Sequence, residues 1–481
     1  MSEPNELLSE ISSFCRQHGL AESTFGRLAV NDGKFVSRLR DGGRVRTHTL
    51  SRVKAFLASP PASVDRTLVI GARNGARAAE TSPARAATPD ALAAPGATAV
   101  RSTLAAATEK MNFRFYDNRQ KYLLFVNTCS EKAVVAQRVG MELANIHPRP
   151  PAVRVFDAGI GDGTVLARVM REMHRRLPTF PFYIVGKEIS LEDVRLTLEK
   201  MPDRFFEHPS TVLVLTNLFY SEAPWLLPKS VTAASSMVWH EVALSGNTAH
   251  EFEQQITDLH PFLSENWTVR ASPASGNPIY ERPVVLVLYR DDYRFLLNDV
   301  IPRRGAVRAD YDLVIASQPY RLRVPTEFKA QRVLAPLARS LGPGGRLLGI
   351  HSRGGDPGME LIQKVWKGEN PFTSDRHALL KALKAELGGG ARHLNFNAYA
   401  DARSVFRYDM HTLPTEIGSS IGTSTLFAAW NAAVYVAQIE DSRLNDALSD
   451  SRYLDATREV LQEHGGLWFY DESYVVSRTR E

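Results

Sequence analysis

The stretch VRVFDAGIGDGTVLARVMREMHRRL, residues 153–177, decides the fold. The apolar run VRVF indicates a buried strand, and the segment after the glycines has the apolar spacing of a helix. The turn between them contains Asp157, Gly159, Gly161 and Gly163. Glycines at a strand-to-helix turn let the backbone approach a ligand closely, and the first N–H groups of the helix then face it. The stretch therefore predicts a phosphate- or nucleoside-type binding loop in an α/β domain.

The next segments strengthen this prediction. A second apolar strand, FYIVGKEIS, ends at Glu188, where a carboxylate is placed to accept hydrogen bonds from both hydroxyls of a ribose. A third, TVLVLT, leads into Asn217. No Gly-Lys-Ser/Thr follows the glycines, so a P-loop nucleotidase is excluded. A dinucleotide-binding dehydrogenase has a similar loop and acid, and it stays open as an alternative.

The pattern Asp157-Ala-Gly159-Ile-Gly161-Asp-Gly163 resembles the first motif, D-x-G-x-G-x-G, of class I S-adenosylmethionine-dependent methyltransferases. The resemblance implies that this loop lies under the methionine and ribose parts of S-adenosylmethionine, with Glu188 on the ribose hydroxyls. It also implies that Asn217 lies beside the adenine. The segments YDLVIASQPY and LGPGGRLLGIHS resemble the fourth and fifth strands of that family, and the resemblance covers residues 150 to about 352. The aspartate before the first glycine and the PGG turn favour a methyltransferase over a dehydrogenase.

Strand-like and helix-like segments alternate from residue 107 to residue 481, which predicts an α/β domain with a Rossmann-like methyltransferase sheet. About ninety residues, 220–310, separate the third strand from YDLVIAS, so we expect an insertion there. The segment SSMVWHEVAL inside it is a rival for the fourth strand. STLFAAWNAAVYVAQIED and GGLWFYDESYVVSRT, within 390–481, are interpreted as late strands, an antiparallel pair at the sheet edge.

Methyl transfer needs mainly positioning and sometimes a base, so few catalytic residues are obligatory. Ser317-Gln-Pro-Tyr320 resembles the D/N/S-P-P-Y/F signature of exocyclic-amine methyltransferases, which implies that Ser317 binds an amine and Tyr320 stacks on a base. Gln318 replaces the first proline of that signature, and a simple strand end is the alternative. His240 is a candidate general base, against a core or surface role. No Pro-Cys pair is present, which disfavours a cytosine-C5 mechanism.

An aromatic segment, FRFYDNRQKYLLFVNT, precedes the first strand. In the methyltransferase family such a segment often closes over the cofactor, so the resemblance implies this role for Tyr116 and Tyr122. The alternative is core packing, because an aromatic stripe at helical spacing is typical of a buried helix face.

Residues 1–59 have the apolar spacing of four short helices, and the segment AESTFGRLAVNDGKFVSRLRDG resembles the helix-turn-helix of phage-repressor-type regulators. The resemblance implies that Lys34, Ser37 and Arg38 reach base edges of DNA, with Arg40 on the same outer face and Arg44 nearer the DNA backbone. Between residues 34 and 54 there are seven basic residues and one acid. Specific recognition would require a homodimer or help from the second domain. Protein docking by a small helical bundle remains the alternative.

Composition sets the remaining limits. The chain has 481 residues and a net charge of +5, and its two cysteines, Cys15 and Cys129, are too far apart for a disulfide framework or a cysteine metal site, so we expect no metal. No apolar run approaches the length of a membrane span, and we expect a cytoplasmic protein without membrane contact. Residues 60–106, rich in Ala, Pro and Arg, predict a flexible linker between a 1–59 module and a 107–481 domain.

Three functions fit this sequence. The first is a methyltransferase that its amino-terminal module brings to DNA, with nucleic acid or protein as the methyl acceptor. The second is a transcriptional regulator whose methyltransferase fold senses a ligand. The third is a small-molecule methyltransferase.

Overall fold

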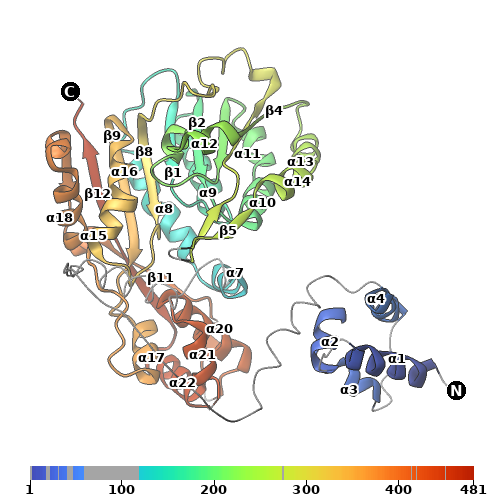
Figure 1. The fold of residues 1–481 in the computed structure, drawn as a ribbon. Helices are drawn as coiled ribbons and strands as arrows, with labels where there is room; N and C mark the ends of the chain where they lie inside the picture. Colours follow the sequence, from blue (N-terminus) through green and yellow to red (C-terminus); the bar gives the residue numbers. More distant parts are fainter. Residues whose placement is uncertain are drawn as a thin grey trace, which may run out of the picture. The chain divides into compact units, whose positions relative to one another are not determined.

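The computed structural model describes residues 3–17, 22–30, 32–40, 47–58, 119–273, 276–412, 414–418, 420–449 and 451–480. The chain forms two compact units, one within residues 1–94 and one within residues 95–481 (Figure 1). Each unit is described by itself. The predicted linker, Arg44 and Tyr116 lie outside the described residues.

The described part of the smaller unit contains four helices, as the apolar spacing predicts. They are α1 (Glu3–Gln17), α2 (Glu22–Val30), α3 (Phe35–Arg40) and α4 (Thr47–Ala58). The rings of Phe14, Phe25 and Phe56 meet edge to face in its core, with centroids 5.5 to 5.9 Å apart. A Cβ on residue 26 would lie 2.3 Å from the carbonyl oxygen of Asp32. Only glycine at this position therefore lets α2 pack so closely against the turn before α3.

The larger unit is built on one mixed sheet with the strand order β10-β12-β9-β8-β1-β2-β3-β7-β4, and β11 pairs with β12. The neighbouring strands β3, β2, β1, β8 and β9 are parallel to one another. β12 runs antiparallel to β9, and β10 runs antiparallel to β12. The strands of this path are β1 (Val153–Asp157), β2 (Phe182–Lys187), β3 (Thr211–Thr216), β4 (Val238–Leu244), β7 (Val284–Arg290), β8 (Tyr311–Ser317), β9 (Leu341–Ser352), β10 (Leu394–Asn397) and β12 (Trp468–Arg478); β11 is Val405–Asp409.

The sheet order shows which segment forms the predicted fourth strand. β8 pairs directly with β1, with Val155 opposite Leu313 and Asp157 opposite Ile315. The rival segment forms β4, which lies at the far end of the sheet, so that alternative is wrong. The insertion between β3 and β8 adds β4 and the antiparallel β7 beyond β3. It also contains a separate pair of strands, β5 (Val269–Ala271) and β6 (Pro278–Tyr280), and the helices α12 (Val231–Ser236), α13 (Ala249–Thr257) and α14 (His260–Asn266).

Helices cover both faces of the sheet, because successive side chains of a strand point to opposite sides. Val155 packs with apolar residues of α8, α9 and α10, whereas Phe156 packs with those of α16 and α18. The strands at the centre are therefore apolar on both faces, as is typical of parallel sheets. These helices and their neighbours are α8 (Glu131–Leu143), α9 (Thr164–Arg176), α10 (Leu191–Glu199), α11 (Pro202–Glu207), α15 (Thr326–Lys329), the π-helical turn η5 (Ala330–Leu334), α16 (Ala335–Arg339) and α18 (Arg376–Leu387).

A third apolar core lies among helices from both ends of the larger unit. These are α7 (Arg119–Thr128), α17 (Pro357–Val365), α20 (Thr423–Val436), α21 (Asp441–Ala447) and α22 (Arg452–His464). The predicted late strand STLFAAWNAAVYV is wrong, because this segment is the helix α20. The second predicted late strand is β12, but it lies inside the sheet between β9 and β10. Short elements complete the unit: α19 (Asp401–Ser404), η3 (Ala223–Trp225), η4 (Asp291–Tyr293), η6 (Gly388–His393) and η7 (Pro414–Glu416).

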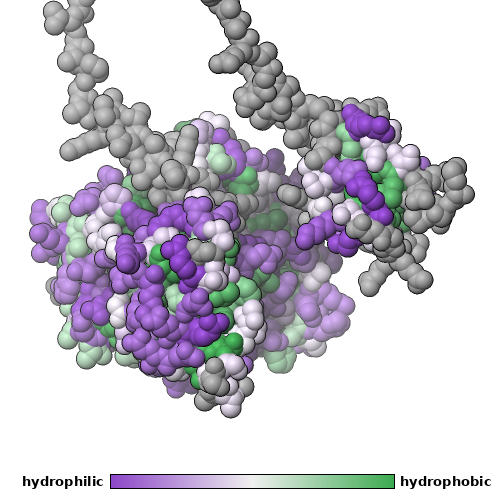
Figure 2. All heavy atoms as spheres, turned by 90° about the horizontal axis from the view of Figure 1, so that it is seen from below, coloured by the Kyte–Doolittle hydropathy of each residue, from purple (hydrophilic) through white to green (hydrophobic). Residues whose placement is uncertain are grey.

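Figure 2 shows a face on which hydrophilic residues predominate and hydrophobic ones form small separate areas. None of the helices in the described residues is long and apolar enough to cross a membrane.

Candidate cofactor site

The glycine loop after β1 has the conformation that its glycines allow. Gly161 and Gly163 have φ values of +52° and +78°, and Gly163 caps the start of α9. A Cβ on Gly163 would lie 2.8 Å from the Cα of Thr197, and one on Gly161 would lie 2.8 Å from the hydroxyl of Tyr122. Gly159 differs from both, because a Cβ there would meet nothing within 4 Å. The loop is thus packed at its second half and open at Gly159.

Side chains from two helices hold this loop in place. The Thr197 hydroxyl donates to Gly161 O at 3.0 Å, and Lys200 Nζ donates to Asp162 O at 2.6 Å. The Tyr122 hydroxyl accepts from Asp162 N at 3.2 Å and donates to Asp162 Oδ1 at 3.3 Å. Tyr122 therefore lies directly on the loop, where the resemblance placed a covering residue. Thr197 and Lys200 were missed, since nothing in their own segment distinguishes them from a solvated helix.

Glu188 follows the last residue of β2 and points to the loop. Its Oε2 accepts from Gly161 N at 3.0 Å, and its Oε1 accepts from Ile189 N at 2.7 Å and Ser190 N at 3.0 Å. The side chain is half-buried, and Trp267 of the insertion donates from Nε1 to the Glu188 carbonyl at 3.2 Å. The carboxylate thus joins the end of β2 to the glycine loop, at the position that the sequence predicts.

Asp157 ends β1 and is buried at the base of the loop. Its Oδ1 accepts from Gly159 N at 3.2 Å. Burial raises the pKa of this carboxyl to about 7, although the Gly159 N–H and the charge of Lys132 oppose the rise.

Asn217 follows β3, but its side chain does not face a site for adenine, which is the role that the sequence predicts. The side chain is buried; its Nδ2 donates to Arg282 O at 2.9 Å, and its Oδ1 accepts from Val284 N at 2.8 Å. The amide therefore fastens β3 to the chain entering β7. Phe219, two residues further, is 40% exposed, and its ring lies 4.8 Å from that of Tyr280. The two rings are tilted by 37° to each other and lie after the end of β3.

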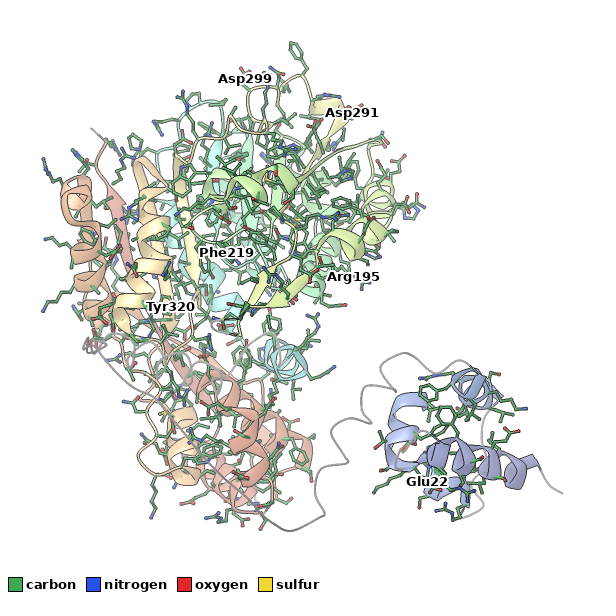
Figure 3. The ribbon with its side chains drawn as sticks, in the orientation of Figure 1. Glu22, Arg195, Phe219, Asp291, Asp299 and Tyr320 are labelled. Carbon is green, nitrogen blue, oxygen red and sulfur yellow. The ribbon has the colours of Figure 1, made fainter. Side chains whose placement is uncertain are left out.

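Figure 3 shows residues at the two ends of the strands of the large sheet. Phe219 and Tyr320 lie toward one end of the strands, whereas Asp291 and Asp299 lie at the opposite end. The glycine loop, Glu188, Phe219 and the segment after β8 all follow the carboxyl ends of parallel strands. Ligands of open α/β sheets bind at this edge.

The segment after β8 turns sharply. Ser317, the last residue of β8, is half-buried. Gln318 follows it with a φ of +48°, a strained value for a residue with a side chain. Gln318 Nε2 donates to Ser352 Oγ at 3.1 Å and lies 3.3 Å from both carboxyl oxygens of Asp471. The Tyr220 hydroxyl donates to Pro319 O at 2.9 Å. The turn thus directs the side chain of Gln318 toward β9 and β12. The sequence marks this residue only as the one that replaces the first proline of the exocyclic-amine methyltransferase signature.

The structure contradicts the base-stacking role predicted for Tyr320. The side chain is buried, and its hydroxyl bonds with His351 Nδ1 at 3.0 Å and Tyr474 Oη at 3.2 Å. His351 Nε2 in turn bonds with Glu472 Oε1 at 2.8 Å. Tyr320 therefore belongs to a polar network between β9 and β12, with no ring face open to a base.

His240 is also placed wrongly by the sequence. It lies on β4, the last strand of the sheet, with β7, β3, β2 and β1 between it and β8. Its ring stacks on that of Phe262, with centroids 4.3 Å apart, and burial lowers its pKa. This is the packing role that the sequence left as the alternative.

A small cavity of about 50 Å³ lies among α7, α8, α20 and the turn after β8. Tyr122, whose hydroxyl bonds the loop, has its ring centroid 6.0 Å from that of Tyr435 in the cavity wall. The cavity is lined by Phe125, Glu131, Lys132, Gln318, Ser352, Tyr408, Tyr435, Val436 and Gln438.

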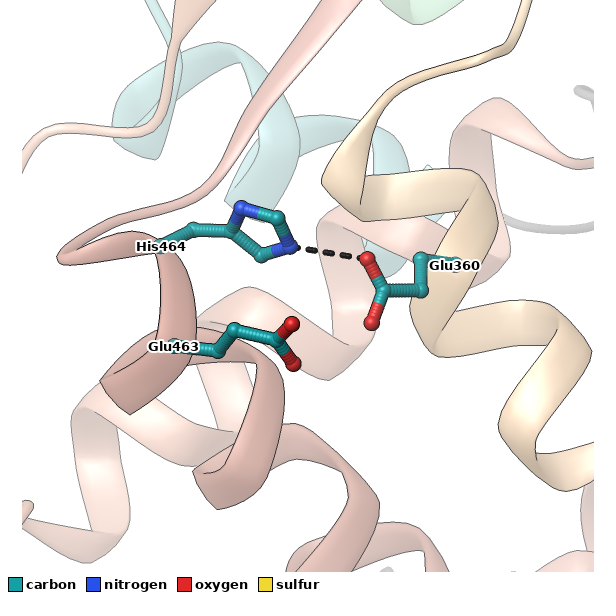
Figure 4. A group of neighbouring side chains, drawn as sticks. All are labelled: Glu360, Glu463 and His464. Carbon is teal, nitrogen blue, oxygen red and sulfur yellow. Dashed lines mark hydrogen bonds and ion pairs between the residues drawn. The ribbon is translucent and has the colours of Figure 1, made fainter.

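One group of side chains has the spacing of metal ligands within the described residues. Glu360, Glu463 and His464 each offer an atom within 4.8 Å of the others (Figure 4). His464 Nε2 lies 2.7 Å from Glu360 Oε2, and Lys364 Nζ lies 3.6 Å from Glu360 Oε1. These contacts already give Glu360 its partners, and we assign no metal to the group.

The sequence matches no family model and no curated protein. Among solved structures, the chain is similar to the plantazolicin methyltransferase BpumL in complex with SAH, at 8% identity over 80% of this chain and 100% of that chain, with a TM-score of 0.30. It is also similar to a geranyl diphosphate methyltransferase in complex with SAM, at 13% identity over 72% and 85% of the two chains, with a TM-score of 0.28. A third, the StiE O-MT, is 12% identical over 72% and 73%, with a TM-score of 0.28. These similarities are low.

Proposed function

We propose that this chain is an S-adenosylmethionine-dependent methyltransferase whose cofactor lies across the carboxyl ends of β1, β2 and β3. The observation that carries the proposal is the joining of the Glu188 carboxylate to the glycine loop, on a sheet with the order β3-β2-β1-β8-β9-β12-β10. In a dinucleotide-binding sheet the sixth strand continues the parallel series beside the fifth. Here the antiparallel β12 occupies that place, which disfavours the dehydrogenase alternative.

The residues present fit S-adenosylmethionine. The open space at Gly159 is a place where a ligand can approach the backbone, and Glu188 offers two carboxylate oxygens at the same loop. The half-exposed ring of Phe219 offers an apolar face at the end of β3. In this proposal Glu188 holds the ribose hydroxyls, the loop from Asp157 to Gly163 holds the methionine part, and Phe219 contacts the adenine. When bound, the cofactor supplies an electrophilic methyl group on a sulfonium.

The chain's own contribution is mainly positioning. Tyr122, Thr197 and Lys200 fix the loop before any ligand arrives, so little ordering cost remains for binding. Tyr122 is half-buried, with its ring centroid 6.0 Å from that of Tyr435 and 5.5 Å from Lys132 Nζ.

Equilibrium binding of S-adenosylhomocysteine tests this proposal. We expect a single site on the full chain, and we expect it to be weakened at least tenfold by Glu188→Ala and unchanged by Glu253→Ala, an exposed glutamate on α13. Preference for a nicotinamide dinucleotide over S-adenosylhomocysteine would contradict the proposal.

We further propose that the smaller unit binds DNA through α3. Phe35, Val36 and Leu39 of this helix are buried, which leaves Lys34 before it and Ser37, Arg38 and Arg40 along it exposed. Two of these arginines have acidic partners: Arg38 pairs with Asp32, and Arg40 Nη2 lies 2.8 and 2.7 Å from the two oxygens of Glu22. Both pairs are exposed, so exchanging a carboxylate for a phosphate costs little.

Binding of a fluorescent DNA duplex at several salt concentrations tests this second proposal. We expect Lys34→Ala and Arg38→Ala each to weaken binding and to reduce its salt dependence, and we expect Arg16→Ala on α1 to leave it unchanged. Binding that is equal in all four proteins would contradict a role for α3.

A further inference from the structure

A short segment between β7 and β8 exposes two large apolar side chains to solvent. Phe295 is 92% exposed and Leu296 is 65% exposed. With Val231 at 86%, they are the three most exposed large apolar side chains of the described residues. Apolar side chains that gather at one place on a surface indicate a contact with another molecule, because water contact is unfavourable for them. We call residues 291–300 the knob.

The backbone of the knob is closed by its own hydrogen bonds. Leu297 N donates to Tyr293 O at 3.0 Å, and Val300 N donates to Leu297 O at 2.8 Å. The side chains of Leu297 and Val300 are buried in the apolar core on one face of the sheet. Phe295 and Leu296 therefore project from a fixed turn, so little ordering cost remains when a partner binds them.

An apolar pocket lies over the same core. It has a volume of about 430 Å³, larger than a phenylalanine side chain, and most of its wall is apolar. Leu227 in this wall is 46% exposed. Ala223 and Leu226, on either side of the pocket residue Trp225 in the sequence, belong to the same buried cluster as Leu297 of the knob. The apolar side chains of the wall are Trp225, Leu227, Pro228, Val307 and Pro336.

The charges of the knob and the pocket are complementary. Residues 291–300 carry three acids and one arginine. Two of these acids, Asp291 and Asp299, form no ion pair with any described residue. The described pocket wall contains two exposed bases, Lys229 and Arg339, and no acid; neither base has an ion-pair partner there. Each surface therefore lacks the charge that the other offers.

We propose that two copies of this chain form a symmetric dimer in which the knob of each copy enters the pocket of the other. Phe295 fills the apolar part of the pocket, and Asp291 and Asp299 approach its two bases. A twofold axis between knob and pocket makes both contacts at once, because each copy gives one knob and receives one. A second copy is favoured over an unrelated partner because this chain carries both halves of the contact.

The knob and the pocket both lie away from the proposed cofactor site. Asp291 and Asp299 are at the opposite end of the strands from Phe219 (Figure 3). On the pocket side, the hydroxyl of Tyr311, the first residue of β8, donates to Pro224 O at 2.9 Å. The dimer therefore leaves the carboxyl ends of the parallel strands open, and its formation does not depend on methyl transfer. It also carries two copies of α3, which a two-part DNA site requires.

Sedimentation of the full chain over a range of concentrations tests this proposal. We expect the wild type to dimerise and its dimer to weaken at high salt. Phe295→Lys in the knob and Leu227→Asp in the pocket should each weaken dimerisation at least tenfold, because each puts a charge into an apolar contact. The control is Phe206→Lys on α11, a phenylalanine that is 56% exposed on the other face of the sheet; it should leave the dimer unchanged.

An equimolar mixture of the knob variant and the pocket variant tests the reciprocal pairing. Each variant alone has two altered contacts. The mixed dimer has one native contact and one in which the introduced lysine meets the introduced aspartate. We therefore expect the mixture to dimerise more tightly than either variant alone. Melting temperature and S-adenosylhomocysteine affinity should match the wild type in both variants, because the replaced side chains are exposed.

A wild type that is monomeric at every concentration, or a dimer that Phe295→Lys leaves unchanged, would overturn the proposal. Equal weakening by Phe206→Lys would indicate non-specific association, and a mixture no tighter than its parts would contradict the reciprocal pairing. A monomer that binds vesicles of anionic lipid, with binding lost in Phe295→Lys, would assign the knob to a membrane surface instead. Failure of the wild type to bind S-adenosylhomocysteine would count against the proposed methyltransferase and not against the dimer.

Discussion

The carboxylate of Glu188 accepts a hydrogen bond from the backbone N–H of Gly161 at 3.0 Å, across 27 residues of sequence. Two neighbouring strands, β1 and β2, bring the two groups together at the same sheet edge. The bond fixes the acid at the position where a ribose would lie over the loop.

Glu188→Gln should weaken S-adenosylhomocysteine binding by roughly tenfold to a hundredfold, because a hydrogen bond to a charged group contributes about 1.5–3 kcal/mol. Calorimetric titration measures it. The matched control is Glu192→Gln, a carboxylate on α10 whose side chain is 51% exposed. An equal loss in both variants would show that Glu188 has no special contact with the ligand.

Two glycines of the loop should behave differently when replaced by alanine. Gly163→Ala introduces strain at a φ of +78° and a Cβ contact of 2.8 Å with Thr197, so we expect a loss of about 1–3 kcal/mol and a clearly lower melting temperature. Gly159→Ala meets nothing within 4 Å, so its melting temperature should stay the same while its S-adenosylhomocysteine affinity falls. Weakened folding in Gly159→Ala with unchanged affinity would contradict the assignment of this open space to the ligand.

Asp157 should make the larger unit less stable as the pH rises. Its pKa is about 7 in the fold against 3.8 as the ordinary value, so the unfolded chain ionises first. Between about pH 4 and 7 the folded protein holds the proton that the unfolded chain releases, and the stability of the fold decreases over that window. Asp157→Asn removes this effect, so its melting temperature relative to wild type should increase from pH 5 to pH 7.5. A constant difference would contradict a buried, protonated Asp157.

Tyr320→Phe should act on stability, not on a base-recognition step. It removes the hydroxyl that bonds with His351 and Tyr474, and we expect a loss of about 1–3 kcal/mol from the two buried partners left behind. His240→Ala, on β4, should leave methyl transfer unchanged. A selective loss of activity in either variant, with normal melting, would restore its catalytic assignment.

The sequence predicts the local parts of this fold well. The glycine loop and the acid after β2 depend on turn conformation and strand ends, which a short stretch of residues determines. The preferred fourth strand, YDLVIAS, is confirmed as β8, but the sequence could not exclude its rival β4, because both segments are apolar runs of strand length and only pairing with β1 distinguishes them. For the same reason His240 was assigned to a site that lies at the other end of the sheet.

The other errors have physical causes as well. In α20 the residues Ala429, Ala432, Ala433 and Val436 are all buried, so the helix lacks the polar face that gives helical periodicity. Tyr320 and Asn217 follow strand ends, as site residues do. However, the hydroxyl of Tyr320 bonds with residues of β9 and β12, and the amide of Asn217 bonds with the backbone at the entry to β7.

Transfer of a tritiated methyl group from S-adenosylmethionine tests the central claim most directly. Wild type and Glu188→Gln would each be incubated with separated DNA, RNA, protein and small-molecule fractions of the source cell. The account predicts label in one fraction with the wild type and strongly reduced label with the variant. No label in any fraction would contradict it, and normal cofactor binding in that case would identify the fold as a ligand sensor.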